Sequence, residues 1–523
     1  MCPDLIVLPE RVRTLDPERP LAEALAIAGG RVQAVGSRDE IIGLRAAGTE
    51  VITLDGACAL PGFHDAHVHL AQYAMGLAAL DLQDTPDQET ALDRVAERAR
   101  TLEAGAWITG AGFALDRWGV RSLEASALDA VAPNHPVLLK SQDHHAGWVN
   151  SAAMAAAGID RNTPDPEHGT IVRDPHGNPT GYLLEHAVGL VSAAVPPADA
   201  TTLSGALDRA GAELAARGIT TVHHMAYEPS NAWRAIADVA SRDDYQLRVW
   251  ACFPHADIEH AAAIGIATAQ GGARFAVGGA KFFADGALGS RTALMLEPYV
   301  DSGELGARIE PEEALRERIE LAARAGLAPV VHAIGDAAVR SVLDVLEATS
   351  GAWRAAGLRP RIEHAQHVHP DDLARFGSLG VVASMQPIHL SFDAASVAAS
   401  LSDRLDRAFP MRSLAAAGAL LAFGSDAPVA RPDVFEGLRA AVRRRGFDGT
   451  TLPMEESIGV EEALTAFTYG AARAIGWERR SGLIRAGYDA DVVVLDHDPV
   501  ESLDDLEVLA TLSAGRVTYR RAV

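Results

Sequence analysis

Short apolar segments alternate with alanine-rich, helix-like segments from about residue 59 to residue 479. Strands that alternate with helices predict βα units around a parallel sheet. The predicted strands end at residues 69, 224, 253, 285, 332, 364, 386 and 426. Eight such units predict an α/β fold of the TIM (β/α)8 barrel type, in which functional side chains follow the C-terminal ends of the strands.

Further strand-like segments lie near the two ends of the chain. They cover residues 5–8, 24–28, 31–35 and 51–54 at one end, and residues 491–495 and 516–519 at the other. The pair Gly29-Gly30 between two of them predicts a hairpin. Neither group has enough apolar surface to fold alone. We therefore expect one small β-sandwich domain, residues 1–58 plus 480–523, beside a barrel domain, residues 59–479.

The connection after the first barrel strand is unusually long. It runs from about residue 71 to residue 215, far more than one βα connection needs. A loop of this length usually has a function of its own. We expect it to form an inserted subdomain that serves as a wall or lid over the barrel mouth.

Charge and cysteine content narrow the choice of partners and compartment. Asp and Glu number 70 against 46 Lys and Arg, which gives a net charge of −24 and disfavours nucleic acid and anionic membranes. The three cysteines are far apart and suggest a reducing compartment. The N-terminus lacks the pattern of a signal peptide, and no apolar run is long enough to span a membrane. We expect a cytoplasmic protein that acts on a small molecule, with a homodimer as one expected assembly.

Two histidines end the first barrel strand, in the segment LPGFHDAHVHL at residues 60–70. Side chains alternate along a strand, so His67 and His69 point to the same side. Two neighbouring imidazoles make half of a site for a divalent metal. The alternative is a pair of polar residues at a strand end, and the other strand ends decide between the two.

Further candidate ligands follow four other strands. They are Lys281 after the fourth, His332 after the fifth, His364 after the sixth and Asp426 after the eighth. In a closed barrel the eighth strand neighbours the first, so Asp426 should stand beside the histidine pair. Two metal ions that share this ring would each keep an open position for water.

These motifs resemble the amidohydrolase superfamily: HVH on the first strand, Lys on the fourth, single His on the fifth and sixth, and GSDAP at residues 424–428. Three longer segments are similar to the amidohydrolase-3 (YtcJ-like) branch, which includes N-substituted formamide deformylases. They are KFFADG at 281–286, GSRTA at 289–293 and HAIGD at 332–336.

The resemblance implies a centre of two divalent ions, with Zn²⁺ as the expected metal and manganese, cobalt or iron as alternatives. His67, His69 and Asp426 would hold the more buried ion, and His332 and His364 the more exposed one. Lys281 would bridge both as N6-carboxylysine, because a free ammonium cannot ligate a metal whereas a carbamate is an anion with two oxygen ligands. The alternative for Lys281 is an ion pair with Asp285.

The chemistry expected of such a centre is hydrolysis. A water bridging two metal ions becomes a nucleophile near neutral pH, and Asp426 would take its proton and pass it to the leaving nitrogen. We expect cleavage of a C–N bond in an amide, an N-acyl or N-formyl amine. One alternative is a mononuclear aminohydrolase that deaminates a cyclic substrate, which Lys281 disfavours. Another is a non-catalytic barrel scaffold, which the complete ligand set disfavours.

A second group of residues has weaker signals. His144 and His145 precede a segment similar to the family's substrate-contacting segment. His145 is the candidate that stabilises the developing oxyanion, and a surface or cap position is the alternative. His224 and Trp118 would line the substrate pocket or lie in the core. Asp285 and Arg291 would orient the fourth loop through an ion pair, or Arg291 would bind a substrate carboxylate.

Overall fold

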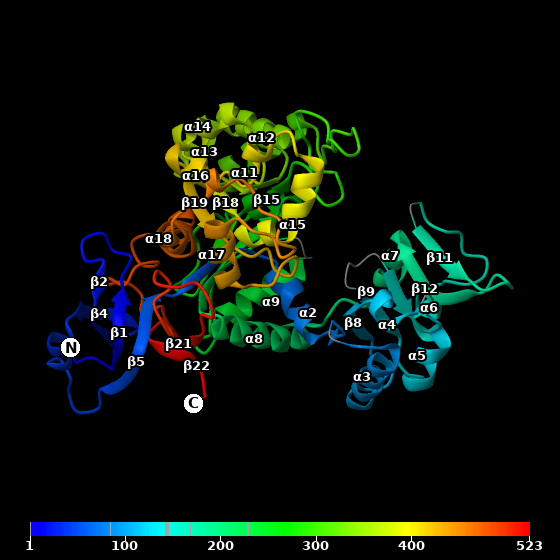
Figure 1. Ribbon diagram of the computed structural model, residues 1–523, viewed down its shortest axis with the longest axis horizontal. Helices are drawn as coiled ribbons and strands as arrows, with labels where there is room; N and C mark the ends of the chain where they lie inside the picture. The colour runs from blue at the N-terminus through cyan, green and yellow to red at the C-terminus, as the bar shows by residue number, and fades with distance from the viewer. Residues whose placement is uncertain are drawn as a thin grey trace. The chain divides into compact units, whose positions relative to one another are not determined.

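The computed structural model describes residues 2–522, except residues 84, 121, 142–145, 168 and 227–229. The chain divides into two compact units, residues 1–73 with 207–523 and residues 74–206. The first unit holds the barrel together with the strands of both chain ends (Figure 1).

The predicted barrel is confirmed. Eight parallel strands follow one another in chain order around the sheet. The barrel closes between the end of β6 and the segment that follows β19. A parallel bridge joins Val68 to Ala427, Asp426 N–H donates to the His67 carbonyl, and His69 N–H donates to the Ala427 carbonyl. The strands are β6 (Phe63–Val68), β13 (Ile219–His224), β14 (Arg248–Pro254), β15 (Phe275–Phe283), β16 (Pro329–Ala333), β17 (Arg361–His364), β18 (Val382–Met385) and β19 (Leu420–Phe423).

Amphipathic helices pack against the strands, as α12 does on β16 and α16 on β19. In α12, buried Val339, Val342 and Leu346 recur at the spacing of one helix face. Pro370 begins α14, and Gly380 at φ 76° ends it. Two helices, α2 (Leu70–Ala78) and α8 (Ala200–Ala216), cross the boundaries between the two units. The other helices of this unit that follow the barrel strands are α9 (Ser230–Ala240), α10 (Ile258–Ala263), α11 (Glu312–Arg324), α12 (Asp336–Ala348), α13 (Ser350–Ala355), α14 (Pro370–Leu379), α15 (Pro387–Ser400), α16 (Met411–Ala416), α17 (Val434–Arg443), α18 (Val460–Thr465) and α19 (Ala471–Ala474).

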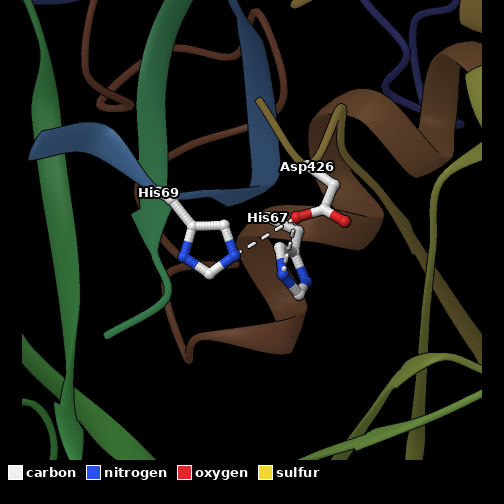
Figure 2. A group of neighbouring side chains, drawn as sticks. All are labelled: His67, His69 and Asp426. Carbon is white, nitrogen blue, oxygen red and sulfur yellow. Dashed lines mark ion pairs between the residues drawn. The ribbon is translucent and has the colours of Figure 1, made fainter. Parts of the chain in front are cut away.

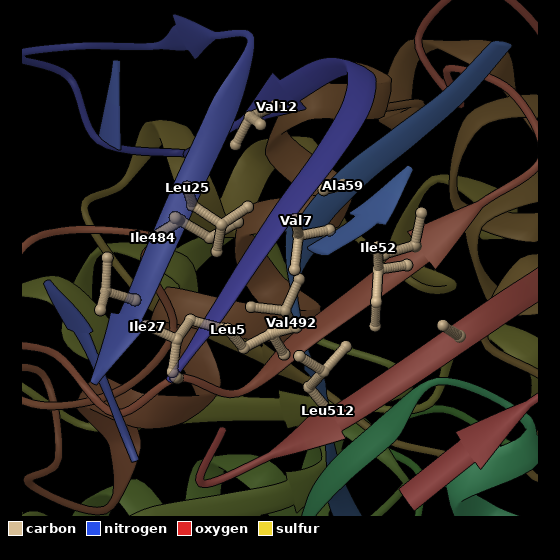
Figure 3. Packing of buried hydrophobic residues seen from close by; sticks show 14 of the residues in the cluster. Leu5, Val7, Val12, Leu25, Ile27, Ile52, Ala59, Ile484, Val492 and Leu512 are labelled. Carbon is tan, nitrogen blue, oxygen red and sulfur yellow. The ribbon is translucent and has the colours of Figure 1, made fainter. Parts of the chain in front are cut away.

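Strands from the two chain ends pair in one mixed sheet, and the predicted bounds of a separate β-sandwich domain, residues 1–58 plus 480–523, stay a prediction. β5 pairs with β1 on one side and with β20 on the other, and strands from both ends share one apolar cluster that includes Leu5, Ile52, Val492 and Leu512 (Figure 3). The strand order is β22-β21-β20-β5-β1-β3-β4, with β2 beside β1. Its elements are β1 (Leu5–Arg13), β2 (Leu21–Ala22), β3 (Ala24–Ala28), β4 (Arg31–Gly36), α1 (Arg38–Ile42), β5 (Glu50–Pro61), β20 (Val492–Leu495), β21 (Val508–Ser513) and β22 (Arg516–Arg520).

The hairpin predicted at Gly29-Gly30 joins β3 to β4. Both glycines have positive φ, 56° and 77°, which a two-residue turn of this kind requires and which glycine adopts without strain.

The second unit is built on a separate six-stranded sheet of order β11-β12-β10-β9-β8-β7. Its residues, 74–206, lie within the predicted insertion of about 71–215, and its role as a lid stays a prediction. The elements are β7 (Leu80–Asp81), α3 (Gln88–Thr101), β8 (Ile108–Phe113), α4 (Leu115–Trp118), α5 (Ala125–Val131), β9 (Val137–Ser141), β10 (Ala146–Val149), α6 (Ser151–Ala156), β11 (Gly169–Arg173), β12 (Pro179–Glu185) and α7 (His186–Ser192).

None of the helices in the described part of the chain is both long and apolar enough to cross a membrane. The three cysteines are free thiols, and two of them, Cys58 and Cys252, are buried.

Candidate metal centre

His67, His69 and Asp426 come together at the C-terminal end of the barrel. Figure 2 shows the two imidazoles, which β6 and the residue after it present to the carboxylate of Asp426. Asp426 Oδ1 lies 3.3 Å from Nε2 of His67 and 3.3 Å from Nε2 of His69. All three side chains are buried, and their ligand atoms lie within 4.8 Å of one another. A nitrogen–nitrogen–oxygen set of this size matches what a divalent metal binds.

The hydrogen bonds around this group fit a metal ion. His67 Nδ1 bonds Glu363 Oε2 at 2.6 Å, and His69 Nδ1 bonds the Met225 carbonyl at 2.9 Å. With Nδ1 engaged in this way, each Nε2 can present its lone pair to a metal. Asp426 Oδ1 is buried and has no hydrogen bond within the described residues. An unpaired buried carboxylate oxygen is costly, and a cation between these three side chains would remove that cost.

Asp426 also belongs to a second candidate group, with His364 and His389. His364 Nδ1 bonds Gln386 Oε1 at 2.7 Å. His389 lies on α15, and its Nε2 is 3.7 Å from Asp426 Oδ2 and has no hydrogen bond within the described part of the chain. His389 was not predicted, although it follows the seventh predicted strand end by three residues. The strand-end rule that selected the other candidates could have found it.

His332 and Lys281 lie beside these two groups. The His332 ring is 4.5 Å from the His364 ring, centroid to centroid, and its Nε2 bonds the Gly286 carbonyl at 3.0 Å. Lys281 is buried, with Nζ 3.5 Å from His67 Nε2. Among the residues that the structure describes, Lys281 forms no ion pair with Asp285, so the alternative weighed for this lysine is wrong.

Burial sets the protonation of the centre. Loss of solvent lowers the pKa of His67 to about 3 and of His332 to about 4, and it lowers the pKa of His364 well below its ordinary value. These imidazoles are therefore neutral at pH 7, the form that binds metals. Burial would raise the pKa of Asp426, but the neighbouring histidines outweigh it and hold that pKa well below the usual range.

A buried network of hydrogen bonds contacts His67 at Nδ1, the ring nitrogen that faces away from Asp426. Glu363, which holds His67 Nδ1, also pairs with Arg361, whose Nε is 2.8 Å from Glu363 Oε1. Arg361 Nη1 bonds His223 Nδ1 at 2.9 Å. Arg361 and Glu363 are both 0% exposed. Neither was predicted. They are two residues apart on β17, so their side chains point to the same face, and charged groups buried inside a barrel need hydrogen-bonding partners.

Two residues of the centre have left-handed backbone conformations. His364 has φ 73° and Asp426 has φ 62°, which is uncommon for residues other than glycine. Adjacent strand residues normally point to opposite faces, yet both Glu363 and His364 approach His67. The positive φ of His364, the last residue of β17, is the departure from strand geometry that allows both side chains to face His67. Such strain persists where the surrounding structure enforces it, commonly at functional sites.

Asp285 and Arg291 do not form the predicted ion pair. Asp285 accepts backbone N–H groups of Leu294, Ile334 and Gly335 at 2.8–3.0 Å. Burial raises the pKa of Asp285 to about 7. Arg291 instead pairs with Asp301 at 2.7 Å. Asp285 therefore fixes the loop after β16 through the backbone, and the prediction failed because it considered only the carboxylate nearest in sequence.

The other second-group residues lie elsewhere. His224 is buried outside the cavity lining and accepts the Leu70 N–H at Nδ1, 3.2 Å away. Trp118 is in the core of the second unit, where its indole N–H donates to the Thr85 carbonyl at 3.0 Å. His224 and Trp118 are thus both buried, the position that the core alternative describes. His144 and His145 lie outside the described residues.

The centre opens into a cavity of about 400 Å³. Its walls combine the candidate ligands with apolar side chains, and its polar members outside the centre are few, as is usual for small-molecule sites. The lining includes Phe283, Leu288, Ile334, Phe392, Gln366 and Asp393.

Comparison with known proteins agrees with this architecture. Residues 50–519 match the amidohydrolase family. The chain is 33% identical to the putative amidohydrolase YtcJ of Bacillus subtilis, with 98% of each chain covered. It is 30% identical to N-substituted formamide deformylase of Arthrobacter pascens, with 99% of this chain and 98% of that protein covered. A metal-dependent hydrolase from Pyrococcus horikoshii OT3, solved without a known function, matches with a TM-score of 0.80 at 26% identity, over 95% of this chain and 98% of that one. The chain therefore belongs to the amidohydrolase family, as its strand-end motifs predict.

Proposed function

We propose that this protein is a metal-dependent hydrolase that cleaves the C–N bond of an N-formyl or N-acyl amine. The observation that carries the proposal is the buried His67–His69–Asp426 group, whose candidate ligand atoms lie within 4.8 Å of one another and which borders a cavity with apolar walls. Similarity to a protein named N-substituted formamide deformylase supports the choice of bond.

Two divalent ions would fit the residues that converge here. His67, His69 and Asp426 would hold one, and His364 with His332 or His389 the other, with Asp426 common to both groups. Zn²⁺ is the first metal to test, because imidazole and carboxylate ligands suit it. Such ions lower the pKa of water and polarise a carbonyl oxygen.

Lys281 would contribute as a carbamate. Its burial lowers the pKa of the ammonium group, which favours the neutral amine that reacts with CO₂. The N–C bond forms as the amine loses a proton, and the product carries a negative charge in place of the positive one. The change suits a position 3.5 Å from His67 Nε2, where an ammonium group would oppose a bound cation.

The chain's own groups would orient the amide and move the proton. Asp426 Oδ1 faces His67 and His69, whereas Oδ2 faces His389. Oδ2 is therefore the oxygen that would accept the proton of the attacking water and return it to the leaving nitrogen. The apolar walls would exclude other water from the cavity and hold the organic part of the substrate.

The test is a hydrolysis screen of N-formyl and N-acyl amines with metal-reconstituted protein, together with the metal content per chain. We expect amine release with two ions bound, and loss of both activity and metal in His67→Ala. His260→Ala, which removes an exposed histidine of α10, is the matched control and should retain both. Hydrolysis that persists in His67→Ala would refute the assignment, and a single bound ion would favour the deaminase alternative.

A further inference from the structure

Asp393 is a carboxylate of the cavity that the proposed chemistry does not use. It lies on α15 one turn after His389, so both side chains project from the same helix face, and both line the cavity. Gln366 Nε2 donates to Asp393 Oδ2 at 2.9 Å. No described residue donates a hydrogen bond to Oδ1.

His389 and Arg291 are the basic groups that act electrostatically on this carboxylate, and neither forms a hydrogen bond or an ion pair with it among the described residues. Among the described lining residues, Lys281 is the only lysine or arginine, and it lies at the metal centre beside His67. Arg291, the residue predicted as a possible anion binder, does not line the cavity. Its guanidinium is engaged by Asp301, Ser396 and the Leu288 carbonyl. On the cavity side, Asp393 therefore faces no described lysine or arginine, and a cationic group of a substrate could approach it there.

The geometry also indicates which end of the substrate would reach Asp393. Asp426 Oδ2, the oxygen that returns the proton to the leaving nitrogen, faces α15 through His389 Nε2 at 3.7 Å. The leaving amine must lie on this side to receive the proton. Its substituent then extends along α15, where Asp393 is the next ionisable side chain on the same face.

We propose that Asp393 binds a cationic nitrogen in the amine portion of the substrate, so that the enzyme prefers N-formyl or N-acyl derivatives of amines that carry a second basic group. The inference rests on the proposed amide hydrolysis. Phe283, Leu288 and Ile334 would contact the methylene groups between the two nitrogens. The net charge of −24 would help to attract such substrates.

The experiment compares two matched substrate series on the metal-loaded protein. One consists of mono-N-formyl α,ω-diaminoalkanes of two to six methylenes, and the other of N-formyl alkylamines of equal length. We expect kcat/KM to be about 10- to 100-fold higher for the best cationic substrate, the range of a charge-assisted hydrogen bond. In Asp393→Asn, which keeps the acceptor for Gln366, the ratio between the series should fall to about 1. Asp244→Asn removes an exposed carboxylate, 79% exposed, and should keep the ratio of the unchanged protein.

The possible failures are separable. If both series are hydrolysed equally, or Asp393→Asn lowers both alike, the inference is overturned and the amide hydrolysis stands. If no amide is hydrolysed, the proposed function fails, and binding then decides the role of Asp393. Calorimetry with 1,5-diaminopentane and pentylamine should show tighter binding of the diamine that Asp393→Asn abolishes. Equal binding of the two amines would overturn the inference.

Discussion

Neutralising Glu363 should weaken both the fold and the metal centre. The carboxylate bonds His67 Nδ1 at 2.6 Å and Arg361 at 2.8 and 3.2 Å, with no exposure to solvent. Glu363→Gln leaves the buried guanidinium of Arg361 without its counter-charge. Removing one partner of a buried ion pair costs about 3–5 kcal/mol. Arg361 keeps its bonds to the Ala66 carbonyl and Ser384, so we expect the lower end, about 3 kcal/mol.

Metal affinity should fall in the same variant for a second reason. Loss of the carboxylate behind a ligating histidine typically costs 10- to 100-fold in metal affinity, because the imidazole is less basic and less firmly oriented. Denaturant unfolding of the metal-free protein gives the stability change, and competition with a chelator gives the affinity. Glu313→Gln, in an exposed position on α11 with 69% of the side chain accessible, is the control. The reasoning is refuted if Glu363→Gln unfolds within about 0.5 kcal/mol of the unchanged protein and binds metal within a factor of about two.

Three further changes test other parts of the structure. His367 is buried, and neither ring nitrogen has a hydrogen bond within the described residues. Burial lowers its pKa from 6.5 to about 3, so between pH 6.5 and pH 3 this imidazole is protonated in the unfolded chain and neutral in the folded one. Stability due to this group is full above pH 6.5 and lost on acidification, and His367→Phe should reduce the slope of unfolding free energy by about 1.4 kcal/mol per pH unit in that window, measured by denaturation at several pH values. Reconstitution of the centre should be faster with bicarbonate, and ¹³C-bicarbonate should give a carbamate resonance that Lys281→Ala abolishes; equal reconstitution without bicarbonate and no resonance would contradict the carbamate. His389→Ala should weaken binding of the second ion about tenfold or more in a metal titration, whereas unchanged binding of both ions would remove His389 from the centre.

The barrel and most of the centre were predictable because both depend on local sequence. Each barrel strand is a short apolar segment, and chain order alone places the eighth beside the first. Asp426 and the histidine pair, far apart in sequence, therefore had to meet. The same rule extended by three residues would have included His389, whose position on the first turn of a helix hid it from a search confined to strands.

Contacts in which a side chain has several possible partners, or either face of a strand, could not be predicted from the sequence in this way. Arg291 had several carboxylates within reach, and the turn that carries it selects Asp301 rather than Asp285. Glu363 required knowledge of which face of β17 lies inside the barrel, and the left-handed conformation of His364 changes that pattern at the decisive residue. Trp118 belongs to an insertion with its own core, whose packing no barrel rule describes.

The way the barrel closes has a consequence for how the protein matures. The segment that carries His67 and His69 forms backbone bonds with residues 426 and 427. The segment after the last strand therefore closes the barrel and also places Asp426 beside the two histidines. A ribosome adds about 5–20 residues per second, so residue 426 is synthesised on the order of 20–70 s after the two histidines. Binding of the proposed ions should therefore occur late in synthesis, and chains that end before residue 426 should not bind them at this centre.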